Sequence, residues 1–170
     1  ARLARGGGAT ARDPPRARRA DGASVEHRGA GLTLLANTVS RRIEWGDCDP
    51  AGIVFNPRFF AFFDDATAML IEAAGWSHAR VVAELGALGW PLVATRAEFR
   101  APCATDDRVT ITSRFTDLRR SSFDVAHRLE RDGTLCVEGF ETRVWTRRDA
   151  DGRLASMPIP EAVRATFRGS

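Results

Sequence analysis

The feature that most constrains the fold of this chain is a helix whose apolar residues cover most of its circumference. The segment Pro57 to Ala74 has helix boundary residues on both sides: Asn56 is a favoured N-cap, Pro57 suits the first helical position, and Gly75 suits the position beyond the end. Its polar face is narrow and consists of Arg58, Asp65 and Glu72. A helix this apolar has to be enclosed, and a sheet is the expected partner.

Alternation of apolar and polar residues predicts the strands of that sheet. The first is a half-buried strand that starts at Val39, ends at Gly46, and places Val39, Arg41, Ile43 and Trp45 on one face. Four strand-like runs follow the long helix, near Pro91–Ala101, Arg108–Leu118, Ser122–Arg131 and Thr134–Arg147. Asp132-Gly133, between the last two, is a strong signal for a tight hairpin.

The order of the elements indicates the fold class. A short helix is expected within Trp76 to Gly89, and Pro160 to Phe167 can form a terminal one. Strand, long helix and then an antiparallel meander predict an α+β architecture with one helix packed on one sheet. A chain of 170 residues fits one domain with an extension, and residues 39–170 are assigned to the domain.

Residues 1–38 are rich in Gly, Ala, Arg and Pro and are expected to be disordered. They hold seven arginines against three acids, a charge of +4, whereas the remainder holds 18 against 19, a charge of −1. A targeting presequence or a nucleic-acid arm are functional interpretations of this extension, but its composition favours an unstructured segment. Nucleic acid is therefore not an expected partner of the domain. No apolar run approaches the roughly 20 residues of a membrane span.

The cysteines and histidines show no metal or disulfide pattern. Three cysteines, Cys48, Cys103 and Cys136, are far apart and odd in number, which favours a reducing, cytoplasmic setting. The three histidines have no ligand spacing, so no zinc site is expected. Cys48 is a possible thiol nucleophile, but no histidine lies near it in sequence, and a buried unreactive cysteine is the commoner case.

The acid loop before the long helix is the strongest candidate for chemistry. Phosphate-binding glycine loops and the GxSxG nucleophile elbow are absent from the sequence. Asp47 and Asp49 would point to the same side of an extended segment, and Gly52 permits close approach of a ligand. A carboxylate opposite the unpaired N–H groups of a helix start suits acyl transfer or hydrolysis. The alternative is that both acids only make Asx-type turn hydrogen bonds.

Asp64 stands out on the long helix because its neighbours at three and four residues are mainly apolar. An unpaired charge would be costly there. A hydrogen-bonded acid at the edge of the solvent and an acid that faces a ligand site are both compatible with this spacing.

The segment GDCDPAGIVFNPRFFAFFDDA, residues 46–66, closely resembles the signature of the hot-dog-fold acyl-CoA thioesterases, specifically the 4-hydroxybenzoyl-CoA thioesterase-like group. The resemblance extends over about Val39 to Pro160 and includes the later segments RAEFRAP and RRSSF. It implies a hot-dog fold, in which an antiparallel sheet of about five strands wraps around one long central helix. It also implies dimers with active sites at the subunit interface, often paired into homotetramers.

The resemblance assigns roles to individual residues. The catalytic carboxylate of the family falls on Asp49, as nucleophile or general base, and the backbone N–H that binds the oxyanion falls at Asn56. Asp64 matches an acid that lines the acyl pocket. Arg119, Arg120 and Ser121 match a strand edge near the coenzyme A nucleotide, although Ser121 replaces an expected basic residue and a solvated arginine pair is the usual alternative.

Two departures from the family pattern concern the substrate. Asn56 stands where some relatives carry histidine, so a mechanism that uses that imidazole is excluded. Trp90 stands where the 4-hydroxybenzoyl enzyme has a small hydroxyl residue near the acyl pocket, which would reshape that pocket.

The expected function is hydrolysis of an aromatic acyl-CoA, of the benzoyl or hydroxybenzoyl type, to the acid and coenzyme A. No cofactor is expected, because coenzyme A is part of the substrate. The alternatives are a thioesterase for aliphatic acyl-CoA or acyl-carrier protein, and a non-catalytic hot-dog protein that binds acyl-CoA.

Overall fold

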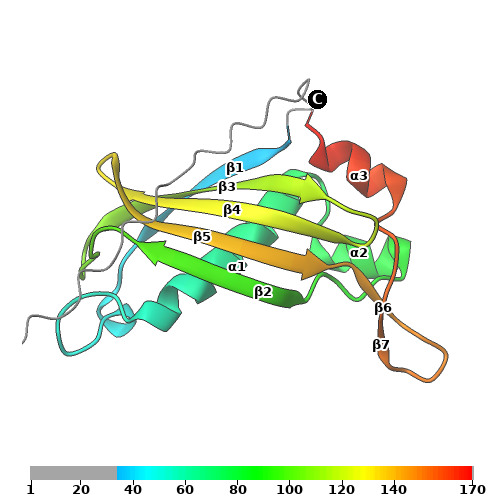
Figure 1. Ribbon diagram of the computed structural model, residues 1–170, viewed down its shortest axis with the longest axis horizontal. Helices are drawn as coiled ribbons and strands as arrows, with labels where there is room; N and C mark the ends of the chain where they lie inside the picture. The colour runs from blue at the N-terminus through cyan, green and yellow to red at the C-terminus, as the bar shows by residue number, and fades with distance from the viewer. Residues whose placement is uncertain (1–33, 170) are drawn as a thin grey trace, which may run out of the picture. The chain divides into compact units, whose positions relative to one another are not determined.

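The structure is a computed structural model that describes residues 34–169, and it consists of an antiparallel sheet with one long helix against its face (Figure 1). The helices are α1 (Asn56–Ala73), α2 (His78–Leu85) and α3 (Glu161–Phe167), with a 3-10 turn, η1, at Trp45–Asp47. The strands are β1 (Ala36–Arg42), β2 (Leu92–Phe99), β3 (Arg108–Leu118), β4 (Ser122–Arg131), β5 (Thr134–Val144), β6 (Thr146–Arg148) and β7 (Leu154–Ser156). The predicted α+β fold, a five-stranded sheet around a central helix, is confirmed.

The main sheet has the strand order β1-β3-β4-β5-β2, and every neighbouring pair is antiparallel. The β4–β5 turn lies at Asp132-Gly133, whose φ angles of 49° and 75° are those of a tight hairpin. The prediction that all four later strands form a meander is wrong for β2, which pairs with β5 at the far edge. The reason is that β1 already occupies the free edge of β3, with Val39 opposite Ile111.

The helix α1 begins one residue earlier than predicted. Phe55 occupies the N-cap position without a side-chain cap, and Asn56 is already helical, so the prediction of Asn56 as the cap is wrong. Pro57 lies in the first turn, where its missing N–H costs no hydrogen bond. At the other end Gly75 has a φ of 88°, and its N–H and the next one donate to carbonyls of the last turn, which closes the helix as predicted.

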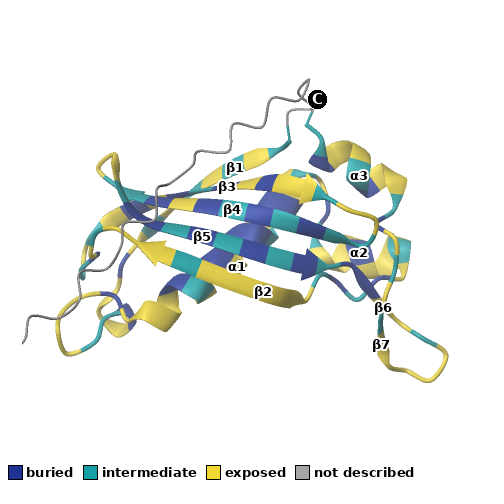
Figure 2. Cartoon of the chain, in the orientation of Figure 1, coloured by how far each residue is buried: buried dark blue, intermediate teal, exposed yellow. Residues whose placement is uncertain are grey.

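The core lies between α1 and the sheet (Figure 2). The buried side of α1 consists of Phe59, Phe62, Phe63, Ala66, Thr67, Leu70 and Ile71. Alternate residues of β3 and β4 are buried against it, as the sequence pattern predicts. The Phe63 ring approaches β5 so closely that a Cβ added at Gly139 would lie 2.5 Å from it. A side chain at position 139 would therefore force the Phe63 ring to shift.

The first strand begins earlier and ends sooner than the sequence indicates. β1 starts at residue 36, and Leu35 is hydrogen-bonded through its backbone to β3 and α3, so residues 34–38 belong to the folded domain. Trp45 is 84% exposed, and its predicted place on the buried strand face is wrong. A capping box between Glu44 and Asp47 turns the chain out of the strand there. The rest of the predicted disordered extension lies outside the described residues.

The two short helices agree with the predictions, whereas the last predicted strand does not. α2 and α3 lie where helices were expected. The predicted run Thr134–Arg147 is divided, because β5 ends at Val144, Trp145 is buried in the core, and β6 pairs with β7 instead of with the main sheet. Within residues 34–169, no helix is long and apolar enough to cross a membrane.

Candidate active site

The acid loop between η1 and α1 is a tight hairpin. Cys48 and Val54 face each other in an isolated antiparallel bridge, and the Asp49 N–H donates to the Ile53 carbonyl at 3.0 Å. Gly52 has a φ of 79°, and its N–H donates to the Asp49 carbonyl at 2.9 Å. These bonds fix the position of Asp49 shortly before the N-terminus of α1.

Asp49 is half-buried and uses one of its two carboxylate oxygens in the loop. Oδ1 accepts a hydrogen bond from the Ala51 N–H at 2.8 Å, which is the Asx-type contact weighed as the alternative to catalysis. Among residues 34–169, Oδ2 has no hydrogen-bond partner or cation. The turn contact therefore leaves one carboxylate oxygen available to a substrate or a water molecule.

Asp47 is placed quite differently from Asp49. It is only 5% exposed, and its Oδ2 accepts a hydrogen bond from the Glu44 N–H at 3.0 Å. Its carboxylate lies 3.6 Å from Arg58 Nε and 4.0 Å from an Arg41 nitrogen. The extended geometry that would turn both acids to one side is absent, because Asp47 ends a 3-10 turn. These contacts make Asp47 a support for the loop.

The start of α1 presents a backbone N–H group beside this loop. The Arg58 N–H donates to the Phe55 carbonyl at 2.8 Å, and Pro57 has no N–H. The Asn56 N–H has no acceptor in the described part of the chain. Such a group carries partial positive charge and can bind a developing oxyanion. Asn56 also borders a mainly apolar hollow of about 320 Å³, lined by Ile53, Val54, Phe59 and Phe99 among others.

The geometry does not support Cys48 as a nucleophile. Its half-buried sulfur accepts a hydrogen bond from the Thr105 hydroxyl at 3.3 Å. The imidazoles of His78 and His127 bond to the Leu88 carbonyl and to other buried side chains instead. Within residues 34–169, no three potential metal ligands of the His, Cys, Asp or Glu type cluster together.

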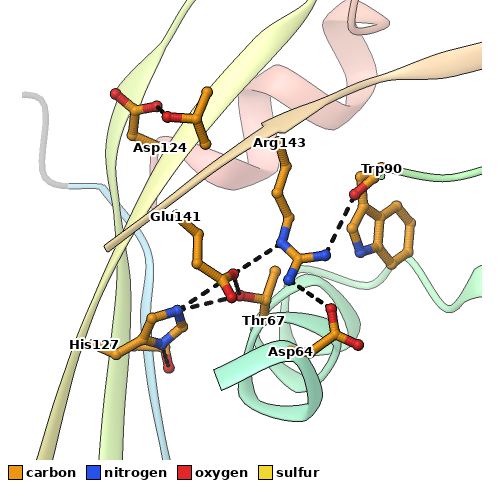
Figure 3. Close-up of polar contacts among 9 residues, drawn as sticks. Asp64, Thr67, Trp90, Asp124, His127, Glu141 and Arg143 are labelled. Atoms are coloured by element: carbon orange, nitrogen blue, oxygen red, sulfur yellow. Dashed lines mark hydrogen bonds and ion pairs between the residues drawn. The ribbon is translucent and has the colours of Figure 1, made fainter. Parts of the chain in front are cut away.

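Asp64 and Trp90, predicted to line the acyl pocket, are joined by Arg143, which sequence reasoning missed (Figure 3). Arg143 Nη2 donates to Asp64 Oδ1 at 2.6 Å, and Nη1 lies 3.4 Å from the Trp90 carbonyl. The Trp90 ring stacks on Trp145 with centroids 5.6 Å apart. Asp64 itself is 64% exposed and hydrogen-bonded, as expected of an acid at the edge of the solvent, and its role at a ligand site stays a prediction.

Arg143 belongs to a buried polar network around Glu141 (Figure 3). Glu141 Oε2 accepts hydrogen bonds from Arg143 Nε at 2.9 Å and from the Thr67 hydroxyl at 2.7 Å, and it lies 3.5 Å from His127 Nε2. His127 Nδ1 is 2.7 Å from the Ser113 hydroxyl. Burial alone raises the pKa of Glu141, but His127 and Arg143 outweigh it and lower the pKa to about 2. The signal in the sequence was two charges, Glu141 and Arg143, in phase with the buried positions of β5.

The residues matched to a coenzyme A contact lie at the β3–β4 turn. Arg119 donates to Asp124 at 2.5 and 2.8 Å and to Asp117 at 2.5 Å. The hydrogen bond with Asp124 is the largest of several causes that raise the pKa of Arg119. Arg120 is exposed and has no ion-pair partner among the described residues, and Ser121 is half-buried. Of this group, Arg120 is the cation that no described carboxylate neutralises.

One chain does not bring all the predicted site residues together. Asp49 and Asn56 lie at the loop before α1, and Asp64 lies about 12 Å further along the helix axis. Figure 1 places the β3–β4 turn, with Arg119 to Ser121, at the opposite end of the sheet from that loop.

Comparison with known proteins places these features in a family context. A family model described as the thioesterase-like superfamily matches residues 43–167. The chain is 35% identical over 129 residues to the 4-hydroxybenzoyl-CoA thioesterase of Pseudomonas sp. strain CBS-3, covering 72% of this chain and 91% of the relative. A crystal structure of a mutant 4-hydroxybenzoyl-CoA thioesterase complexed with 4-hydroxybenzoyl-CoA aligns with a TM-score of 0.73 and 31% identity, covering 78% of this chain and 98% of the other. A gentisyl-coenzyme A thioesterase aligns with a TM-score of 0.69 and 30% identity, covering 77% and 99% of the two chains.

Proposed function

Because the chain belongs to the thioesterase-like superfamily, we propose that it hydrolyses an aromatic acyl-CoA, of the benzoyl or hydroxybenzoyl type, to the free acid and coenzyme A. Two of the similar proteins are named as thioesterases for 4-hydroxybenzoyl-CoA and gentisyl-CoA, and both of these acyl groups are aromatic. The observation that carries the proposal is that one loop–helix junction holds both an Asp49 oxygen and an Asn56 N–H that have no hydrogen-bond partner among residues 34–169.

The chemistry follows from these two groups. The Asn56 N–H donates to the thioester carbonyl oxygen and stabilises the negative charge that develops on it. Asp49 acts in one of two ways. As a nucleophile it attacks the carbonyl carbon, expels the coenzyme A thiolate and forms an anhydride that water then hydrolyses. As a general base it takes a proton from water while the water oxygen attacks the same carbon, and the tetrahedral intermediate then collapses and expels the coenzyme A thiolate, which takes up that proton.

Asp64 and Trp90 are assigned to the acyl end of the site. Both contact Arg143, which keeps them near each other although they come from α1 and from the connection before β2. The Trp90 ring offers an aromatic surface, and the outer oxygen of Asp64 offers a hydrogen-bond acceptor. These features suit an aromatic acyl group that carries a polar substituent.

The nucleotide end is assigned to the turn that holds Arg119, Arg120 and Ser121. Arg119 is already paired with two aspartates, so it shapes the turn more than it binds an anion. Arg120 is exposed and suits a phosphate of coenzyme A. Ser121 contributes a hydroxyl where a cation is the family pattern.

We also propose that two copies of the chain form each site, as homodimers that pair into homotetramers in the cytoplasm. The two ends of the proposed site lie at opposite ends of the sheet, and a second subunit can bring its own turn to the Asp49 loop. The edge strand β2 pairs only with β5 among the described residues and exposes Leu92, Val93 and Phe99 (Figure 2). An open apolar edge of this kind is a common site of strand pairing between copies.

The test is an assay of the full chain on a panel of acyl-CoA thioesters, in which the release of free thiol measures hydrolysis. Aromatic thioesters are expected to be hydrolysed with the highest kcat/KM. A preference for aliphatic acyl-CoA or acyl-carrier protein would overturn the substrate class. Tight acyl-CoA binding without thiol release would identify a non-catalytic binding protein. Light scattering on the same sample reports the number of subunits.

A further inference from the structure

Four polar side chains from α1 and β5 connect the helix to the sheet (Figure 3). Asp64 and Thr67, three residues apart, share a face of α1, and Glu141 and Arg143, two apart, share a face of β5. Hydrogen bonds join Thr67 to Glu141 at 2.7 Å, Glu141 to Arg143 at 2.9 Å and Arg143 to Asp64 at 2.6 Å. The position of the exposed Asp64 carboxylate is therefore linked to a carboxylate in the core.

Arg143 is the centre of this arrangement. Its side chain is only 5% exposed, and its three nitrogens contact Glu141, Asp64 and the Trp90 carbonyl. A guanidinium is planar and holds its partners at fixed angles, whereas a lysine ammonium does not. One buried side chain thus sets the relative position of the two residues assigned to the acyl pocket.

Asp64 retains one oxygen for a ligand. Oδ1 is occupied by Arg143, while Oδ2 has no partner within the described part of the chain, and the side chain is 64% exposed. A carboxylate accepts hydrogen bonds and does not donate them when ionised. An acceptor held in a fixed direction selects for a donor group on the ligand, such as a ring hydroxyl.

We infer that Arg143 is a positioning residue for acyl selectivity: it orients Asp64 so that the site favours an aromatic acyl group with a ring hydroxyl over an unsubstituted one. The inference rests on the proposed function and deepens it. Arg143 is buried and contacts Asp64, which lies about 12 Å along α1 from the proposed oxyanion site at Asn56, so its effect is expected on the choice of ring and not on turnover in general.

Three variants, and the combination of Arg143→Lys with Asp64→Asn, test this role. Arg143→Lys keeps a positive charge beside Glu141 but removes the planar fork. Removing Arg143 alone would take from the buried Glu141 charge one of the two neighbours that stabilise it, so the second variant combines Arg143→Met with Glu141→Gln, which removes both charges. Asp64→Asn is the reference, because it changes the acceptor itself. Thermal unfolding identifies the variants that fold.

Selectivity is measured in two ways. Calorimetry compares the Kd values of inert thioether analogues of hydroxybenzoyl-CoA and benzoyl-CoA, and kinetics compares kcat/KM for the two thioesters. For the wild type, Kd and kcat/KM are expected to favour the hydroxylated ring by about tenfold or more, because a hydrogen bond to a charged group contributes an affinity of this order. Folded Arg143 variants are expected to lose most of this preference, and Arg143→Lys is expected to add nothing in the Asp64→Asn background.

The outcomes separate this inference from the proposed function. If no thioester is hydrolysed but the analogue Kd ratio changes as expected, the proposed reaction fails and the role of Arg143 stands. If hydrolysis occurs while folded Arg143 variants keep the wild-type ratio, the role of Arg143 is wrong. The role of Arg143 is also wrong if the wild type does not prefer the hydroxylated ring. It is wrong as well if the effects of Arg143→Lys and Asp64→Asn on this preference are additive.

Discussion

The hydroxyl of Thr67 donates a 2.7 Å hydrogen bond to the carboxylate of Glu141, which joins the middle of α1 to β5 through an acid that is only 3% exposed. His127 and Arg143 complete the surroundings of this acid. One Glu141 oxygen, Oε1, is buried without a hydrogen-bond partner within the described chain. The ionised form of Glu141 is stable only with these neighbours, because an uncompensated charge in the core is costly.

Glu141 is expected to make stability depend on pH in the acid range. Its pKa falls from the usual 4.5 to about 2 in the folded state, so the folded chain binds this proton less tightly than the unfolded chain does. Its contribution is fully present above about pH 4.5 and is lost as the pH falls toward 2, which amounts to about 3 kcal/mol. Urea unfolding of the wild type and of Glu141→Gln between pH 7 and 2.5 measures it. The variant should show a flatter pH profile, and Glu84→Gln, at an exposed site, should not.

Asp49 and Asp47 are expected to respond oppositely to the same substitution. Asp49→Asn removes the proposed nucleophile or base and should lower kcat at least about a hundredfold, with little change in unfolding free energy. Asp47→Asn weakens a buried, ion-paired carboxylate and should cost about 1–3 kcal/mol of stability while most of kcat remains. Steady-state kinetics and urea unfolding of both variants separate the two roles. Near-normal turnover by folded Asp49→Asn would reject the catalytic assignment.

Sequence patterns predicted the fold to the extent that local signals decide it. β3 and β4 were predicted with their exact bounds, because alternation and turn residues at both ends are local properties. The position of β2 in the sheet was not predicted, because the sequence of an edge strand does not indicate which strand it pairs with. The prediction for the first strand was wrong at Trp45. The alternation of apolar and polar residues continues past Arg42, where β1 ends, but the capping box at Glu44 starts a 3-10 turn there.

The sequence names the residues of the candidate site, whose roles stay predictions, but it does not show how these residues are connected. Asp49, Asn56 and Asp64 lie on one short stretch, and a family motif marks that stretch. Arg143 is 79 residues away from Asp64 in sequence, and only the packing of β5 on α1 brings them together. Sequence spacing also could not distinguish Arg119 from Arg120, whereas the neighbouring aspartates do so in the fold.

Arg120 is expected to affect substrate binding and Arg119 the integrity of the turn. Arg120→Ala removes an exposed cation that has no ion-pair partner in the described chain, and should raise KM for acyl-CoA about two- to fivefold. The same variant should hydrolyse the acyl-pantetheine thioester, which lacks the nucleotide, like the wild type. Arg119→Ala should instead lower the melting temperature, because it leaves Asp117 and Asp124 without their cation. An equal effect of Arg120→Ala on both thioesters would contradict the nucleotide contact.

A side chain at position 139 is expected to destabilise the fold because of Phe63. An added Cβ would lie 2.5, 2.6 and 2.9 Å from three carbons of the Phe63 ring, which is held in place by its stack on His127 at 4.7 Å. Gly139→Ala should therefore cost about 1–3 kcal/mol of unfolding free energy. Gly46→Ala is the matched control, since an added Cβ there has no atom within 4 Å. Combining Gly139→Ala with Phe63→Leu should cost less than the sum of the two single changes, because the smaller side chain relieves the contact. Urea unfolding of the four variants measures this coupling, and full additivity would show that the Phe63 ring is not what excludes a side chain at position 139.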